Sequence, residues 1–248
     1  LYATKPFATM WRELGKIFKD PRLRQLFGRY ATYCGSSPFD APATLMLIAH
    51  AERTGVWLVE GGMQRLAEAM ADLAGELGVE LRYGADVARL DTERDRVRAV
   101  HLGDGERIDA DAVVFNGDVA ALNNGLLGDT VRRATPARAD EPRSLSAITW
   151  SLDARTAGFP LHYHNVFFGT DYPDEFSSIF ARQRVTAEPT VYVCAKSRMD
   201  DAVPADHEPL LLLINAPPRP FSEDELAAID RHATESGLNI WAASSDAG

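Results

Sequence analysis

The stretch from residue 56 to residue 118 constrains the fold of this chain more than any other part of it. Apolar residues at three- and four-residue spacing predict a helix over 63–77, and Gly78 ends it. Short apolar or alternating runs predict strands on either side of this helix, at 56–59, 79–83, 87–90, 97–102 and 112–115. Strands and helices that alternate in this way are typical of an α/β nucleotide-binding architecture.

The flanking parts of the chain predict helices followed by a mixed sheet. Residues 5–30 carry an apolar stripe at helical spacing that is interrupted at Asp20-Pro21, and a second helix is expected at 42–54. Further strands are predicted at 144–152, 164–168, 190–195 and 210–215, and helices at 172–181 and 222–233. We therefore expect an α/β (α+β mixed) chain in which the later residues form a mixed sheet with helices.

Composition excludes several classes of protein. The formal net charge is −10, which disfavours a nucleic-acid binder because such proteins carry a basic face. Cys34 and Cys194 are far apart and form no CxxC pair, so a disulfide framework or a zinc site is not expected and a reducing cytoplasmic setting fits. The first residue is Leu1 rather than methionine, from which we expect a start inside a longer reading frame.

The charge is unevenly distributed along the chain. Residues 1–30 hold seven basic and two acidic side chains, a balance of +5, which leaves −15 for the rest. An apolar stripe flanked by Lys and Arg is compatible with a helix that lies on an anionic membrane surface, and equally with a core helix that has a solvated face.

A few residues are candidates for binding chemistry. Gly61-Gly62 lies between a predicted strand and a predicted helix, where free backbone N–H groups could face an anion or where the glycines simply permit a tight turn. His162 and His164 would share one side of a strand and could ligate a metal, although no acidic or cysteine partner has a telling spacing. Asp171, Asp174 and Glu175 cluster at a predicted helix start, where we expect capping. Neither a G-x-G-x-x-G turn nor a G-x-S-x-G elbow is found.

Several ordered blocks resemble one family. They are the run from Leu23 to Phe39, the block Gly55 to Met63 with Leu66-Ala67, Asp111 to Asp118, Pro160 to Phe168, Pro189 to Ala195 and Leu211 to Pro217. Together they resemble the phytoene-desaturase-like, FAD-dependent carotenoid desaturases, and within them the hydroxycarotenoid (methoxyneurosporene) 3,4-desaturases. The match covers about residues 5–235, and the chain resembles an internal portion of such an enzyme.

The resemblance implies a function and its setting. It implies FAD as cofactor, an acyclic hydroxylated or methoxylated carotenoid as substrate, an apolar cavity lined from residues 7–50 and 145–215, and a location in the cytoplasm, peripheral to the inner membrane. Two alternatives stay open: a related flavin oxidoreductase that acts on a polyprenyl or amine substrate, and a non-catalytic fragment that binds an apolar ligand or a membrane.

The resemblance also implies site residues and a domain organisation. By position, the cofactor-binding candidates are Val87, Asn116, Gly117, Asp118, Gly61 and Gly62, whereas no catalytic residue and no metal ligand is assigned. The expected domains are a helical part of a substrate domain (1–54), a portion of a Rossmann-like FAD-binding domain without its G-x-G-x-x-G unit (55–128), the substrate-domain sheet (129–240) and an unmatched tail (241–248).

Overall fold

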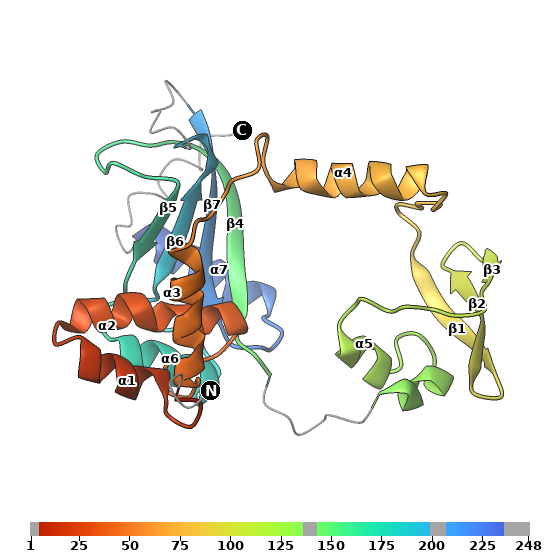
Figure 1. Cartoon of the computed structure of the whole chain (residues 1–248), viewed down its shortest axis with the longest axis horizontal. Coiled ribbons are helices and arrows are strands. Elements are labelled where there is room, and N and C mark those ends of the chain that lie inside the picture. Colours follow the sequence, from red (N-terminus) through yellow and green to blue (C-terminus); the bar gives the residue numbers. More distant parts are fainter. Residues whose placement is uncertain (1–4, 136–142, 199–206, 236–248) are drawn as a thin grey trace. The chain divides into compact units, whose positions relative to one another are not determined.

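A computed structural model describes residues 5–135, 143–198 and 207–235 of the chain, and within the last helix the side chains up to residue 231 (Figure 1). The chain folds into two compact units, one formed by residues 1–55 and 143–248 and the other by residues 56–142. The expected tail at 241–248 lies outside the described residues, and the functional domain boundaries expected at 54/55 and 128/129 stay predictions.

The first unit is built on a four-stranded sheet with the order β4-β7-β6-β5. Its strands are β4 (Ser146–Arg155), β5 (His164–Phe167), β6 (Val191–Ala195) and β7 (His207–Ala216). The expected combination of a sheet with helices is confirmed with one correction, because all pairings in this sheet are antiparallel rather than mixed.

One face of this sheet carries the main hydrophobic core. Val193, Leu212 and Ala195 are completely buried there, and Trp150, Phe167 and Ile229 pack against them. Ile229 comes from α7 (Glu223–Glu235), which begins with the predicted capping box: the Glu225 N–H donates to Ser222 Oγ (3.2 Å) and the Ser222 N–H donates to Glu225 Oε2 (2.9 Å).

Short helices from the first fifty residues complete this unit. They are α1 (Met10–Ile17), α2 (Pro21–Gly28), the 3-10 helices η2 (Arg29–Cys34) and η3 (Ala43–Met46), and α3 (Leu47–Glu52). The predicted interruption at Asp20-Pro21 is confirmed, since Asp20 caps α2 by accepting from the Arg22 N–H (2.9 Å). Met10 and Leu14 are fully buried, so the centre of the apolar stripe faces the core while Phe7 and Ile17 stay exposed.

The helix α6 (Tyr172–Phe180) joins the N-terminal helices to the sheet. Tyr172 lies 5.9 Å from the Trp11 ring and 5.0 Å from the Phe176 ring, within one aromatic cluster. Beside it Glu175 is buried, where it accepts hydrogen bonds from Thr190 Oγ1 (2.5 Å) and Asn215 Nδ2 (2.9 Å). Burial raises the pKa of the Glu175 carboxyl group, because desolvation penalises its charged form.

The second unit contains a long helix and a small meander. Its helices are α4 (Met63–Glu76), α5 (Val119–Asn123) and the 3-10 helix η4 (Asp129–Ala134), and its antiparallel strands are β1 (Val87–Glu93), β2 (Arg96–Leu102) and β3 (Arg107–Asp109). Leu90, Leu122 and Val131 form its small core. The predicted end of α4 is confirmed, since Gly78 adopts φ +83° and its N–H donates to the Gly75 carbonyl (2.9 Å).

Three strands predicted in this unit are absent from the described residues. The segments 56–59, 79–83 and 112–115 pair with no strand there, and Trp57 and Val114 are 82% and 95% exposed. The apolar face of α4 is also exposed, with Met70 and Leu77 66% and 75% accessible. An apolar run predicts a buried segment, but a strand also requires a hydrogen-bonded neighbour, and this part of the unit offers none.

Candidate functional site

The paired glycines form a turn at the start of α4. Gly61 and Gly62 adopt φ +78° and +86°, in the left-handed region that favours glycine, so a side chain at either position would strain the backbone. The first turn of α4 has neither an acidic residue nor a side-chain cap, which leaves backbone N–H groups available to an anion. Both interpretations made from the sequence are compatible with this geometry.

The other predicted cofactor residues lie elsewhere in the same unit. Val87 begins β1 and pairs with Leu102, and it is 38% exposed. Asn116 and Gly117 precede α5, and the Asp118 side chain caps that helix by accepting from the Ala120 N–H (2.9 Å). The helix α4 has fourteen residues and is therefore about 21 Å long, and it separates the glycine turn at its start from β1 (Figure 1), so the structure does not bring Gly61 and Gly62 next to Val87.

The two histidines have partners of another kind. His164 Nδ1 lies 2.8 Å from the Tyr192 hydroxyl, and the His162 backbone N–H donates to Asn165 Oδ1 (2.9 Å). Among the described residues, no group of three or more His, Cys, Asp or Glu side chains is arranged to hold a metal.

The three acidic residues at the start of α6 have separate roles. Asp171 caps the helix by accepting from the Asp174 N–H (2.9 Å), which confirms the predicted capping. Asp174 instead accepts a hydrogen bond from Thr186 in the segment that follows α6, and Glu175 points into the core. The spacing of Tyr172, Glu175 and Phe176, one position and its +3 and +4 neighbours, could have placed Glu175 on the buried face.

A cavity of about 770 Å³ lies against the core face of the first unit's sheet. Its apolar floor comes from the strands, and α7 and the segment 184–189 supply its sides. The residues that form the floor and the helical side are Trp150, Phe167, Val191, Ile214, Ala228 and Ile229. A cavity of this size with a mostly apolar lining and a few polar groups is typical of a binding site for a small organic molecule.

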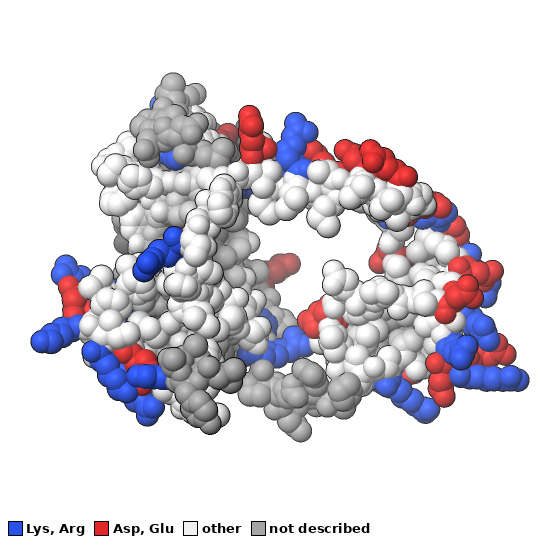
Figure 2. All heavy atoms as spheres, in the orientation of Figure 1, with Lys and Arg blue, Asp and Glu red and all other residues white. Residues whose placement is uncertain are grey.

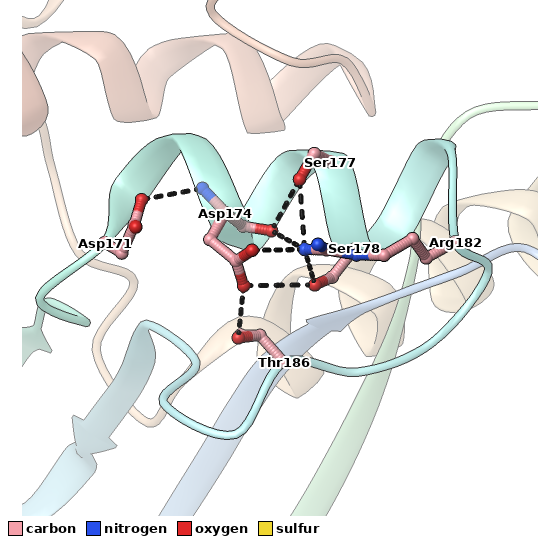
Figure 3. A network of polar contacts seen from close by, with 6 residues as sticks. All are labelled: Asp171, Asp174, Ser177, Ser178, Arg182 and Thr186. Carbon is pink, nitrogen blue, oxygen red and sulfur yellow. Dashed lines mark hydrogen bonds and ion pairs between the residues drawn. The ribbon is translucent and has the colours of Figure 1, made fainter.

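Polar contacts hold the side of this cavity that follows α6 (Figure 3). Asp174 accepts from Arg182 through Oδ1, and through Oδ2 from Thr186 Oγ1 (3.1 Å) and Ser178 Oγ (3.3 Å). Arg182 lowers the pKa of the Asp174 carboxyl group most, and the two hydroxyl groups lower it further. Asp174 is therefore ionised at neutral pH and fixes the position of Thr186.

A second set of contacts holds the lining at Gly169, Thr170 and Glu188. Thr170 Oγ1 donates to Glu188 Oε2, and the Gly169 carbonyl accepts from Gln25 Nε2 (3.0 Å). On the floor, Trp150 Nε1 donates to Asp230 Oδ1 of α7 (2.7 Å). The cavity thus combines an apolar floor with a rim of oriented oxygen atoms, an arrangement that can bind a long apolar molecule and contact one polar group on it.

Comparison with known proteins identifies the family. The family model described as "Flavin containing amine oxidoreductase" matches residues 12–152, more than half of the chain. The chain belongs to this flavin-containing oxidoreductase family. The match spans segments of both units and agrees with the expected flavin dependence and mixed α/β class.

Within this family the chain is similar to carotenoid desaturases, as its motifs predict. It is 51% identical to a hydroxyneurosporene desaturase of Rubrivivax gelatinosus, over 95% of this chain and 46% of the relative. It is 49% identical to a hydroxyneurosporene desaturase of Cereibacter sphaeroides (91% and 46%) and 34% identical to a 1-hydroxycarotenoid 3,4-desaturase of Flavobacterium sp. (82% and 41%). The chain spans about half the length of these curated relatives.

The residues present fit part of a flavin site. A helix start with open backbone N–H groups suits an anionic part of the cofactor, and an added Cβ atom on Gly62 would meet nothing within 4 Å, so a ligand can approach closely. The G-x-G-x-x-G turn that binds the pyrophosphate is found nowhere in the sequence. The roles of Gly61, Gly62, Val87, Asn116, Gly117 and Asp118 in cofactor binding stay predictions.

The cavity is lined in part by one of the segments for which the sequence predicts substrate contacts, and those contacts stay predictions. The expected lining segment 145–215 contains the floor and the Thr186 side, while Ala228 and Ile229 lie beyond it, and the segment 7–50 supplies none of the lining residues. Thr186 carries no sequence signal, because its partner Asp174 is twelve positions away in a helix.

Proposed function

We propose that this chain is part of an FAD-dependent desaturase that acts on an acyclic carotenoid bearing a hydroxyl or methoxy group. The observation that carries the proposal is the 51% identity to a hydroxyneurosporene desaturase over 95% of the chain. The apolar cavity supports it, since a polyene offers almost only apolar surface and is held by burial of that surface.

The chemistry divides between cofactor and protein. Desaturation converts a C–C single bond into a double bond by removing a hydride from one carbon and a proton from its neighbour, and a flavin supplies the hydride acceptor. The residues of this chain hold and orient the polyene and exclude water from it. Asp174, which lines the cavity, is ion-paired with Arg182 behind it, and we assign neither residue a proton transfer.

A chimera tests this function directly. In the Rubrivivax gelatinosus relative, the matching 46% of the sequence is replaced with this chain. We expect the purified chimera to show a flavin absorption spectrum. It should also convert hydroxyneurosporene into a product with one more conjugated double bond, which chromatography and mass spectrometry detect. The unmodified relative is the control. A chimera that folds and holds flavin but leaves hydroxyneurosporene unconverted contradicts the proposal.

We further propose that the first unit binds the cytoplasmic surface of the inner membrane, from which an apolar substrate enters. Figure 2 shows Lys and Arg side chains gathered over α1 and α2. Arg12, Lys19 and Arg22 are exposed there beside exposed apolar side chains, of which Phe7 is 93% and Ile17 59% accessible. Among the described helices none is long and apolar enough to span a bilayer.

Replacing Lys19 with Glu should weaken binding to anionic vesicles roughly thirtyfold. Each basic residue near an anionic surface contributes about 1 kcal/mol, so reversing one charge costs about 2 kcal/mol. Cosedimentation with phosphatidylglycerol vesicles measures the change, and neutral phosphatidylcholine vesicles should bind all variants weakly. The matched control is Arg96→Glu at an exposed position of β2, and this variant should bind the vesicles as the unaltered chain does. Equal losses for Lys19→Glu and Arg96→Glu would show that only net charge matters.

A further inference from the structure

The hydroxyl group of Thr186 is an oriented hydrogen-bond acceptor at the rim of the cavity. Its proton points to Asp174, because an ionised carboxylate can only accept and the Oγ1–Oδ2 distance is 3.1 Å. No second hydrogen bond to the Thr186 oxygen is found among the described residues, so its lone pairs are available to a ligand. Thr186 is half-buried and lines the cavity.

The network behind Thr186 fixes this polarity. Arg182 donates to both Asp174 and Ser178, and Ser178 in turn donates to Asp174, so the carboxylate stays charged and cannot release its hold on Thr186 (Figure 3). The other carboxylate in the lining, Glu188, accepts a hydrogen bond from the Thr170 hydroxyl group in the same way. These hydroxyl groups therefore present acceptors, not donors, to a molecule in the cavity.

We propose that Thr186, positioned by Asp174, accepts a hydrogen bond from the hydroxyl group of an acyclic carotenoid whose apolar chain lies on the cavity floor. This inference rests on the proposed function and narrows its substrate class from hydroxylated or methoxylated carotenoids to hydroxylated ones. A hydroxyl group can donate to Thr186, whereas a methoxy oxygen is only an acceptor and would face another acceptor. Thr186 is thus a specificity-determining residue.

The exposed Arg184 is the competing group, because its guanidinium also borders the cavity and donates hydrogen bonds. A donor would bind hydroxyl and methoxy oxygens alike. The two residues therefore predict different ligand preferences: Thr186 discriminates between the two groups, and Arg184 does not.

Quenching of Trp150 fluorescence provides the measurement, since this indole lies on the cavity floor. The chain in detergent micelles is titrated with hydroxyneurosporene, its methyl ether and neurosporene. We expect hydroxyneurosporene to bind about five- to tenfold more tightly than the other two, which is the range of one net hydrogen bond. Trp150→Phe should abolish the saturable quenching, because Trp11 and Trp57, the other tryptophans in the described part of the chain, do not line the cavity.

Three variants test the assignment to Thr186. Thr186→Val should remove the preference for the hydroxyl group and leave neurosporene binding unchanged, while Thr186→Ser should keep the preference. Ser177→Ala is the matched control, since Ser177 bonds to Arg182 in the same network but does not line the cavity. Thermal unfolding of each variant verifies that the fold is intact.

The possible outcomes separate this inference from the proposed function. If all three carotenoids bind equally, or if Thr186→Val keeps the preference, the inference is overturned while the cavity remains a carotenoid site. A preference that Arg184→Gln removes and Thr186→Val does not also overturns it. If no carotenoid quenches Trp150, the cavity is not the carotenoid site and the inference falls with it, whereas the chimera still decides whether the chain supports desaturation.

Discussion

Replacing Arg198 with Leu should lower the free energy of unfolding by about 3–5 kcal/mol, because it leaves the buried carboxylate of Glu208 without its partner. The side chains of Arg198 and Glu208 are only 6% and 1% exposed. Arg198 donates to both carboxylate oxygens, to Thr156 Oγ1 (2.9 Å) and to the Leu161 carbonyl (3.2 Å). It therefore joins β7 to the segments that follow β4 and precede β5, across the base of the main core.

Urea unfolding of the chain measures this loss, with the exposed pair Arg22–Asp20 as the matched control. Arg22 is 87% exposed, so Arg22→Leu should leave the free energy of unfolding almost unchanged. The double variant Arg198→Leu with Glu208→Leu should recover much of the loss, since no unpaired charge is then buried. If Arg198→Leu is as stable as Arg22→Leu, water reaches the Glu208 carboxylate.

The pH dependence of the same pair has a definite sign. Arg198 lowers the pKa of Glu208 below its ordinary value of 4.5 in the folded chain. The stability that the pair contributes is therefore fully present above about pH 4.5 and is lost as the pH falls through the lowered value. Arg198→Leu should accordingly remove more stability at neutral pH than in acid.

Replacing Gly169 with Ala should destabilise the first unit by about 3 kcal/mol and distort the cavity. A Cβ atom at this position would lie 2.1 Å from the carbonyl oxygen of Glu188, far inside van der Waals contact. The obstacle is backbone, so the two segments must separate, and both line the cavity. We expect the affinity for the carotenoid, measured by the quenching of Trp150 fluorescence, to weaken at least about tenfold, the equivalent of 1.4 kcal/mol.

Gly75→Ala is the matched control, because it makes the same chemical change with the opposite expected result. Gly75 lies within α4, and a Cβ atom there would meet nothing within 4 Å. Alanine is favoured over glycine in a helix by about 1 kcal/mol, so this variant should be slightly more stable than the unaltered chain. Destabilisation of similar size in both variants would mean that the close approach at Gly169 is relaxed in solution.

The exposed apolar segments of the second unit show where prediction from sequence fails. The apolar run 56–59 and the strand-like segment 79–83 carry the pattern of buried strands, yet Trp57 and Tyr83 are each 82% exposed. The strands predicted at 87–90 and 97–102 are confirmed as β1 and β2, which pair with each other across a short turn. The spacing of apolar side chains predicts which face of a segment is buried. Whether that segment forms a strand depends on backbone hydrogen bonds to a second strand, which the spacing does not specify.

Several local features of this chain follow directly from its amino-acid pattern: the capping box at Ser222 and Glu225, the cap at Asp20 and the glycine that ends α4. These features depend on neighbours within a few positions. Only the folded chain shows that the main sheet is antiparallel and that Thr186 and Trp150 line one cavity. The physical reason is that each of these depends on contacts between residues distant in the sequence, which no local pattern specifies.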